Sequence, residues 1–330
     1  MKLVIQIPCF NEENYLTETI DAIPGTFPGV EHVEILIIDD GSTDRTFEIA
    51  RNHPRCSAVT RLNSHQGLAA AFARGLNVAC DMGADIIVNT DADNQYYGKD
   101  IEKLIQPITD GQADMVVGCR PIEEIEYFSP AKKILQRLGS RVVRFITNTP
   151  VLDATSGFRS YTRETAQKIF LHTKFTYTLE TLVFAGKKNL RVVSVPIRVN
   201  PTKTRESRLF SSTFDYVKQS LATLLRLYLF YEPLKSFTYA SIAILTMGAA
   251  LLAWALGGHT PYSIELFLSA VLVIFLGFST FSLGILGDIN GAQKQLLEES
   301  LVRIKNLETQ MQKNLSRDET KQNPSGGFTF

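Results

Sequence analysis

The sequence predicts an α/β domain with a mostly parallel, Rossmann-like sheet, followed by a membrane-anchoring region. Over residues 1–115, short apolar runs alternate with helical patterns, which is the rhythm of βαβ units with right-handed crossovers. From about residue 237 the chain becomes strongly apolar and supplies two long runs separated by a short turn-like stretch. The first observation predicts the fold of the N-terminal part, and the second predicts how the protein is held in the cell.

The strands are predicted from short, β-branched apolar runs, and the helices from apolar residues at helical spacing. The run at 190–199 should lie at a sheet edge, because Pro196 has no N–H to donate to a central ladder. The other predicted strands cover 3–8, 33–39, 84–90 and 114–120, and the helical patterns between them cover 14–23, 44–53 and 68–83.

Composition excludes several classes of protein. Lys+Arg and Asp+Glu are equal at 34 each, so no bulk charge indicates a nucleic-acid partner. The four cysteines form no C-x-x-C pair and no metal-ligand spacing. We therefore interpret them as reduced thiols of a cytosolic domain.

The two apolar runs, 237–256 and 264–286, are each long enough to cross a bilayer, which takes roughly 20 residues. A pair of buried core helices is the alternative. The loop between the runs has no Lys or Arg, whereas the outer flanks carry Arg226, Lys235 and Lys294. The positive-inside rule then predicts a two-span membrane protein whose catalytic domain and both termini are cytoplasmic.

The segments around the spans complete the predicted organisation. A helix over 210–235 would lie along the membrane surface or pack on the soluble domain. A second amphipathic helix, cytoplasmic and covering 288–315, could pair subunits into a homo-oligomer. The predicted domains are 1–209 for the α/β domain, 210–235 for the juxtamembrane helix, 236–287 for the membrane hairpin, 288–315 for the second helix and 316–330 for a disordered tail.

Polar residues cluster where the predicted strands end. The segments are PCFNEEN (8–14), DDGSTD (39–44), TDADNQ (90–95) and Arg120 after the fourth strand. Each segment alone is consistent with a turn or a helix cap. In a doubly wound sheet, however, the carboxyl ends of the strands border one ligand crevice. In an extended segment Asp91 and Asp93 would project to the same side.

This set of residues suits a nucleoside diphosphate and a divalent metal. Carboxylates repel a pyrophosphate, and Mg²⁺ or Mn²⁺ resolves the repulsion by taking carboxylate, water and phosphate oxygens together. Asp91 and Asp93 would hold the ion, and Gln95 could add an oxygen ligand. Asp40 would lie where a ribose or base can hydrogen-bond, with His65 as a further neighbour.

PCFNEE, DDGSTD, the D-x-D with Asn-Gln behind it and TSGFRSY (155–161) together resemble the family 2 glycosyltransferases of the GT-A fold. The subset that the chain resembles makes polyprenyl-phosphate sugars. The resemblance implies a nucleotide-sugar pocket that includes Asp91 and Asp93, and catalytic roles for Asp93 and for Asp153 near the reacting centre. It also implies a metal and diphosphate site at Asp91, Asp93 and Gln95. The remaining residues that it implies for the nucleotide pocket are Pro8, Asn11, Glu12, Glu13 and Asp40.

The same resemblance implies a set of groups that bind the acceptor phosphate. TKTRESRL (202–209) stands where the family has an R-x-x-G-x-S-K-L-like stretch, and the choice between Lys203 and Arg205 as the phosphate-gripping residue stays open. Gln136 stands where the resemblance implies a basic residue, and the neighbouring Arg137 is the candidate substitute. The full set of candidates is Arg120, Arg137, Ser140, Arg159, Lys203, Arg205, Ser207 and Arg208.

The expected reaction is inverting transfer of a hexose from a UDP-glucose- or GDP-mannose-type donor to undecaprenyl or dolichyl phosphate. A phosphate monoester has a second pKa of about 6, so it is a ready nucleophile without a general base. One alternative is a membrane glycosyltransferase that uses a glycan or glycolipid hydroxyl as acceptor, with Asp153 as base. The other is a non-catalytic scaffold with a degenerate transferase domain.

Overall fold

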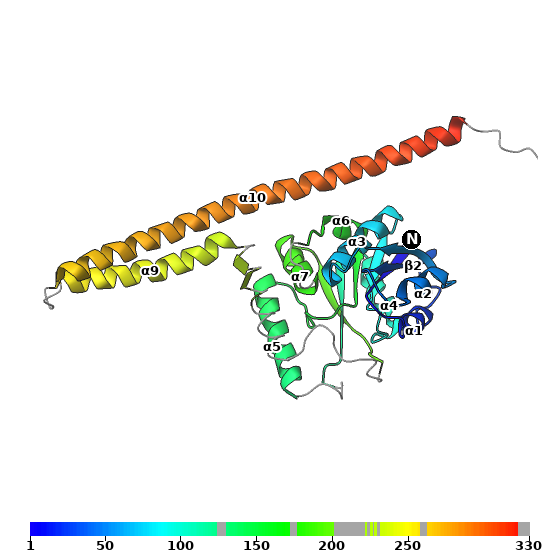
Figure 1. Ribbon diagram of the computed structural model, residues 1–330, viewed down its shortest axis with the longest axis horizontal. Helices are drawn as coiled ribbons and strands as arrows, with labels where there is room; N and C mark the ends of the chain where they lie inside the picture. The colour runs from blue at the N-terminus through cyan, green and yellow to red at the C-terminus, as the bar shows by residue number, and fades with distance from the viewer. Residues whose placement is uncertain are drawn as a thin grey trace, which may run out of the picture. The chain divides into compact units, whose positions relative to one another are not determined.

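The computed structural model describes residues 1–123, 130–171, 177–200, 232–257 and 263–322, together with residues 222, 225, 226, 228 and 229. The chain divides into an α/β unit that begins at Met1 and a helical unit over Leu221–Lys305 (Figure 1). The two units are taken in turn below.

A seven-stranded sheet with the order β3-β2-β1-β4-β6-β5-β7 forms the centre of the α/β unit. Only β6 runs antiparallel to its neighbours β4 and β5 within this sheet, and the other pairings are parallel. The predicted mostly parallel α/β fold is thus confirmed. The strands are β1 (Lys2–Cys9), β2 (His32–Asp39), β3 (Cys56–Arg61), β4 (Ile86–Asn89), β5 (Met115–Cys119), β6 (Arg159–Thr162) and β7 (Val192–Pro196).

Two of these strands were not predicted. β3 is an edge strand whose residues are only partly buried, so it lacks a continuous apolar run. β6 has the sequence RSYT, and its first three residues are fully buried although two of them are polar. Pairing with β4 and β5 places β6 in the interior. β7 is the opposite edge, as predicted from Pro196.

The helices cover both faces of the sheet. Leu3, Ile5 and Ile7 of β1 share a core cluster with residues of α1 and α4, and α3 packs against the other face of β1 and β2. The helices of this unit are α1 (Leu16–Asp21), α2 (Thr46–Asn52), α3 (Leu68–Asp81), α4 (Ile101–Thr109), α5 (Pro130–Thr147), α6 (Arg163–Lys168) and α7 (Tyr177–Lys187), with a short 3₁₀ turn at Gly98–Asp100.

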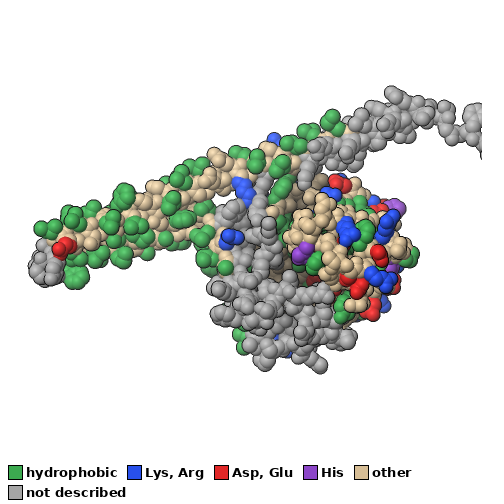
Figure 2. All heavy atoms as spheres, viewed as in Figure 1, with side chains coloured by type: hydrophobic (Ala, Val, Ile, Leu, Met, Phe, Trp, Pro, Cys, Tyr) green, Lys and Arg blue, Asp and Glu red, His purple; other side chains and the backbone are tan. Residues whose placement is uncertain are grey.

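The helical unit is an antiparallel pair made of α9 (Pro233–Leu256) and α10 (Ser263–Gln322). Both helices are long and apolar enough to cross a membrane, and Figure 2 shows hydrophobic side chains along the outside of the pair. Small residues at a spacing of seven line the contact, with Gly248 in α9 and Gly277 in α10 each facing a side chain of the other helix. The Ser241 hydroxyl donates to the Gly277 carbonyl at 2.9 Å. Close backbone approach at small residues is how helices associate in lipid.

The C-terminal segments differ in part from the predicted boundaries. The second span and the predicted 288–315 helix form one continuous helix, which reaches Gln322 and so extends into the stretch predicted to be disordered. A helix can continue from an apolar segment into a charged one without a break, because its backbone hydrogen bonds are satisfied within the helix in either surrounding. Most of the predicted 210–235 helix, and residues 323–330, lie outside the described residues.

Candidate active site

The segments after β1 and β2 are held together by reciprocal hydrogen bonds. The Asn11 amide oxygen accepts from the backbone N–H of Thr43 at 2.8 Å, and the Asn11 N–H donates to the Ser42 hydroxyl at 2.9 Å. The Glu13 carboxylate accepts from the N–H of Arg45 at 3.1 Å. Asn11 has a positive φ of 55°, which Asn tolerates better than most residues. Asn11 and Glu13 therefore shape the DDGSTD turn.

The neighbouring residues Pro8 and Glu12 belong to the same framework. Pro8 is buried in β1 opposite Ile38 of β2. The backbone N–H of Glu12, whose side chain is also buried, donates to the Thr46 hydroxyl at the start of α2 at 2.8 Å. Pro8, Asn11, Glu12 and Glu13 thus lie together at the predicted sheet edge.

Asp40 anchors the loop that follows β3. Its carboxylate, only 2% exposed, accepts from the backbone N–H groups of Gln66 and Gly67, both at 2.8 Å. The imidazole Nδ1 of His65 lies 2.8 Å from the same carboxylate, and the His65 ring stacks on Phe10 at 3.8 Å. The structure thus brings Asp40 and His65 together, and their place in a nucleotide pocket stays a prediction.

Gly41 permits this arrangement. Its φ of +72° is in the left-handed region, and a Cβ at this position would lie 2.8 Å from the backbone nitrogen of His65. A side chain would therefore meet both conformational strain and a backbone clash. The glycine of DDGSTD lets the loop after β3 pack directly on the turn after β2.

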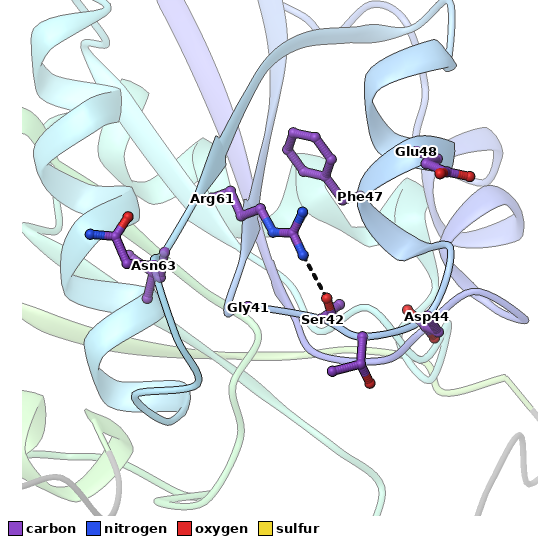
Figure 3. Close-up of a pocket in the computed structure, with 9 residues that line it drawn as sticks. Gly41, Ser42, Asp44, Phe47, Glu48, Arg61 and Asn63 are labelled. Atoms are coloured by element: carbon purple, nitrogen blue, oxygen red, sulfur yellow. Dashed lines mark hydrogen bonds between the residues drawn. The ribbon is translucent and has the colours of Figure 1, made fainter.

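A cavity of about 700 Å³ lies beside the DDGSTD turn (Figure 3). Arg61 extends into it, with Nη2 donating to the Ser42 carbonyl at 2.7 Å, Nε 3.1 Å from the Asp39 carboxylate and the guanidinium over the Phe47 ring. All residues that line the cavity come from 41–63, next to Asp40 in the sequence, and none of them belongs to the D-x-D segment. The lining residues are Gly41, Ser42, Thr43, Asp44, Phe47, Glu48, Arg61, Leu62 and Asn63.

The D-x-D segment is a turn, which corrects the extended geometry assumed from the sequence. β4 ends at Asn89, and Asn94 adopts a positive φ of 52°. Asp93 Oδ1 accepts from the backbone N–H of Gln95 at 3.2 Å, so the turn is closed by its own aspartate. Asp91 and Asp93 are both partly exposed at the end of a core strand.

Gly157 of the TSGFR motif lies directly against this turn. A Cβ at Gly157 would be 2.8 Å from Asp91 Oδ1 and 2.6 Å from the Tyr177 hydroxyl. Within the described ranges no group of three or more His, Cys, Asp or Glu side chains is arranged around a metal position. Two carboxylates in one turn nevertheless fit Mg²⁺, which commonly takes one or two protein carboxylates and completes its shell with water and substrate phosphates.

Arg120 and Asp153 form a buried, bidentate ion pair. Arg120 Nε donates to Asp153 Oδ2 at 2.7 Å, and Nη2 donates to Oδ1 at 3.0 Å. Nη2 also lies 2.7 Å from the Thr155 hydroxyl. Burial alone would raise the pKa of Asp153, but the Arg120 guanidinium and the Thr155 hydroxyl hold it below the ordinary value. The two residues, predicted for different tasks, are each other's main partner.

Helix α5 adds Ser140 and Gln136 to this cluster. The Ser140 hydroxyl accepts from the N–H of Ala154 at 3.1 Å, and Gln136 Nε2 donates to the Thr155 hydroxyl at 3.0 Å. Arg137 instead pairs with Glu123 on the exposed side of the helix, with Nε and Oε1 3.1 Å apart. Gln136, not Arg137, therefore occupies the position beside Arg120.

Arg159 has an interior role. It is fully buried, and its guanidinium donates to the carbonyls of Ser156, Thr178 and Ala154 and to the Thr181 hydroxyl at 2.7–2.8 Å. A guanidinium so enclosed fixes the 154–156 loop to α7. This geometry departs from the expected contact of Arg159 with an acceptor phosphate, because its donors face protein carbonyls.

The chain after β7 returns to the D-x-D turn. Asn200 donates from its backbone to the Gln95 carbonyl at 2.9 Å and from its side chain to the Asn94 carbonyl at 2.6 Å. Lys203, Arg205, Ser207 and Arg208 lie outside the described residues.

The sequence did not indicate the buried polar residues behind the site. Gln6, Asn89, Tyr96 and Tyr177 are at most 5% exposed, and each reads as an ordinary strand, loop or helix residue in the sequence. The only local signal is Asn89 itself, a polar residue that ends an apolar run.

Comparisons with known proteins agree with this geometry. Residues 4–170 match the model of glycosyl transferase family 2. The chain is 29% identical over 224 residues to the UDP-N-acetylglucosamine–dolichyl-phosphate N-acetylglucosaminyltransferase of Methanococcus voltae, covering 61% of this chain and 87% of that protein. It is 26% identical over 300 residues to the undecaprenyl-phosphate 4-deoxy-4-formamido-L-arabinose transferase of Edwardsiella ictaluri, covering 87% and 88%.

Among solved structures, the fold is similar to that of glucosyl-3-phosphoglycerate synthase from Mycobacterium tuberculosis in complex with Mn²⁺, UDP and phosphoglyceric acid. The TM-score is 0.52 at 20% identity, over 69% of this chain and 78% of that one. This likeness supports the fold alone.

Proposed function

The chain belongs to glycosyl transferase family 2, and we propose that it transfers a hexose from a nucleoside diphosphate sugar to a membrane polyprenyl phosphate. The two named relatives differ in the sugar and share a polyprenyl or dolichyl phosphate in their names. The acceptor class is therefore the better supported half of the proposal, and the donor is of the UDP-glucose or GDP-mannose type.

The Arg120–Asp153 pair is the observation that carries the choice of acceptor. A hydroxyl acceptor needs a general base whose pKa lies near the working pH. Asp153 is the predicted base, but Arg120 holds its pKa below the ordinary value of a carboxyl group, so it is a weak proton acceptor. A phosphate acceptor needs no base and needs cations instead. The cluster around Arg120 suits the phosphate.

In the proposed reaction an oxygen of the lipid phosphate attacks the anomeric carbon. The bond from that carbon to the donor diphosphate breaks, the nucleoside diphosphate leaves and the configuration inverts. Asp153 orients the Arg120 guanidinium, and Gln136 and Ser140 hold the loop that carries Asp153. Lys203 and Arg205, which follow Asn200 in the sequence, are the further candidates for gripping phosphate.

Asp91 and Asp93 are the residues that would hold Mg²⁺ or Mn²⁺, with Gln95 beside them. The ion would neutralise charge on the leaving diphosphate. On the donor side, the Asn11, Glu12 and Asp40 framework forms a rigid wall for the nucleotide, and rigidity there lowers the ordering cost of binding.

A lipid acceptor requires the catalytic domain to work at a membrane surface. Besides the two helices that are apolar enough to span a bilayer, α5 carries an exposed apolar stripe at helical spacing, with basic residues around it. Such a helix suits the boundary between lipid and water. We propose that α5 contacts the bilayer and that the catalytic domain and both termini are cytoplasmic. The stripe consists of Ile134, Leu138, Val142 and Phe145, and the basic residues are Arg137, Arg141 and Arg144.

The proposal is tested with a panel of radiolabelled nucleotide sugars. Membranes containing the full chain are incubated with undecaprenyl phosphate and Mg²⁺ or Mn²⁺, and label is counted in the organic phase. We expect one donor to label an alkali-stable, acid-labile lipid, and Asp93→Ala to abolish the transfer. Label in a glycan or a diacyl glycolipid would instead support the hydroxyl-acceptor alternative. Metal-dependent UDP or GDP binding without transfer to any acceptor would support the scaffold.

A further inference from the structure

A chain of buried polar side chains runs beneath the D-x-D turn. Gln6 Nε2 donates to Asn89 Oδ1 at 2.9 Å, and Asn89 Nδ2 donates to the Tyr177 hydroxyl and to the Gly157 carbonyl, both at 2.9 Å. Gln6, Asn89 and Tyr177 are fully buried. Burying polar groups costs free energy that an apolar core would avoid, so a network of this kind indicates a specific positioning role.

The network holds Gly157, whose open Cβ side faces the Asp91 carboxylate. A single point, the position of a Cβ on Gly157, lies 2.6 Å from the Tyr177 hydroxyl and 2.8 Å from Asp91 Oδ1. Gly157 is held on both sides of its backbone. Its N–H donates to the Tyr96 hydroxyl at 3.0 Å, and its carbonyl accepts from Asn89 and, at 3.3 Å, from Tyr177.

Electrostatics keeps the two tyrosines in their donating form. Burial and the nearby Asp91 charge both raise the pKa of Tyr177 and of Tyr96. Both hydroxyls therefore stay protonated at any physiological pH and present no second negative charge to Asp91.

The Tyr177 ring is fixed independently of its hydroxyl. It stacks on Phe72 with ring centroids 3.9 Å apart and planes 8° from parallel. Removal of the hydroxyl alone should leave this packing in place, which separates the polar role of Tyr177 from its contribution to the core.

We infer that Tyr177 is a positioning residue for the donor side of the site. Its hydroxyl and the Asn89 amide hold Gly157 of the 153–157 loop. Gly157 in turn sets where the Asp91 carboxylate lies for binding metal and diphosphate. The inference rests on the proposed function, because it assigns Tyr177 to the nucleotide-binding half of that site.

The test compares Tyr177→Phe with Tyr161→Phe in the full chain in detergent micelles. Tyr161 is the matched control because it is also fully buried and also contacts Phe72, while its hydroxyl faces Thr181 and Arg159 and not Asn89 and Gly157. The measured quantity is the Kd of Mn²⁺ in the presence of saturating UDP or GDP. Loss of one or two hydrogen bonds predicts a rise of about 3- to 10-fold for Tyr177→Phe and no change for Tyr161→Phe.

A second measurement uses Gly157→Ala. Its added methyl group would lie 2.6 Å from the Tyr177 hydroxyl, so the alanine should weaken Mn²⁺ and nucleotide binding strongly. Combined with Tyr177→Phe, the same alanine should cost measurably less, because the nearest clashing atom is gone and only the approach to the Asp91 carboxylate remains. Non-additivity of this kind is the signature of direct coupling.

Equal Kd values for the two tyrosine variants, or strictly additive effects with Gly157→Ala, would overturn the inference and leave the proposed function standing. If the wild-type chain binds Mn²⁺ with nucleotide yet transfers no sugar to lipid phosphate, the proposed function fails. The comparison between Tyr177 and Tyr161 still decides the inference in that case, because it reads binding and not transfer.

Discussion

The two flanks of the site hold a buried aspartate in different ways. On the β2 flank, Asp40 accepts from two backbone N–H groups and lies against an imidazole, all from a loop about 25 residues later in the chain. On the β5 flank, Asp153 accepts from two nitrogens, Nε and Nη2, on one edge of the Arg120 guanidinium. Backbone partners have fixed positions and no net charge, whereas Arg120 carries a full charge that must be compensated. The β2 flank, which is the donor flank of the proposed function, is thus a rigid frame, and the β5 flank, its proposed acceptor flank, is a buried pair of opposite charges.

This difference predicts the largest effect on the acceptor flank. Asp153→Ala leaves the Arg120 charge buried and unpaired, which should lower the free energy of unfolding by about 3–5 kcal/mol. The measurement is denaturant unfolding of the full chain in detergent micelles. As a control, the double variant Arg120→Met with Asp153→Leu should recover most of that stability without recovering transfer. A double variant as unstable as Asp153→Ala would show that the pair itself stabilises the fold.

On the donor flank, the backbone is the sensitive element. Gly41→Ala should cost about 2–4 kcal/mol, since it adds left-handed strain to a contact 2.8 Å from the His65 nitrogen. Gly29→Ala is the matched control, because Gly29 has a φ of +73° but nothing within 4 Å of an added Cβ. It should cost about 1–2 kcal/mol and leave the donor KM unchanged. Equal costs for the two would show that the loop after β3 adapts.

The pH dependence of the unfolding free energy tests the Arg120–Asp153 pair on the β5 flank. Because the folded pKa of Asp153 is lowered, its stabilising contribution is complete above the unfolded pKa of about 3.9 and is lost as the pH falls toward the folded value. The gap in unfolding free energy between wild type and Asp153→Asn should stay constant from pH 8 to 5. Below about pH 4 it should shrink by up to about 1.4 kcal/mol per pH unit. A gap that already narrows at pH 6 would contradict the buried ion pair.

The smallest effect is expected on the outer face of α5. Arg137 and Glu123 are both more than half exposed, and such pairs contribute about 0–1 kcal/mol. Arg137→Ala should therefore leave stability within about 0.5 kcal/mol of wild type. Gln136→Ala, on the inner face, should raise the apparent KM for the lipid phosphate more than Arg137→Ala does. The reverse order would return Arg137 to the position beside the acceptor.

The sequence predicted the elements whose burial follows from their own apolar residues. Apolar runs located β1, β2, β4, β5 and the two long apolar helices α9 and α10, and Pro196 located the β7 edge. β6 could not be found in this way, because Arg159 and Ser160 are buried by pairing with strands more than 40 residues away. The D-x-D turn was misjudged as extended for a related reason, since its shape depends on Asp93 binding the backbone of Gln95.

By itself, the sequence determined which chemical groups gather at the carboxyl edge of the sheet, because strands joined by βαβ crossovers run parallel and end at the same edge. Only the tertiary structure decided what those groups bind. Arg120 and Asp153 are 33 residues apart in the sequence and form an ion pair. The Arg159 guanidinium is buried and donates to carbonyls of the 154–156 loop and of α7. A side chain's role depends on the charges and carbonyls that long-range packing brings within about 3 Å, and no local pattern encodes them.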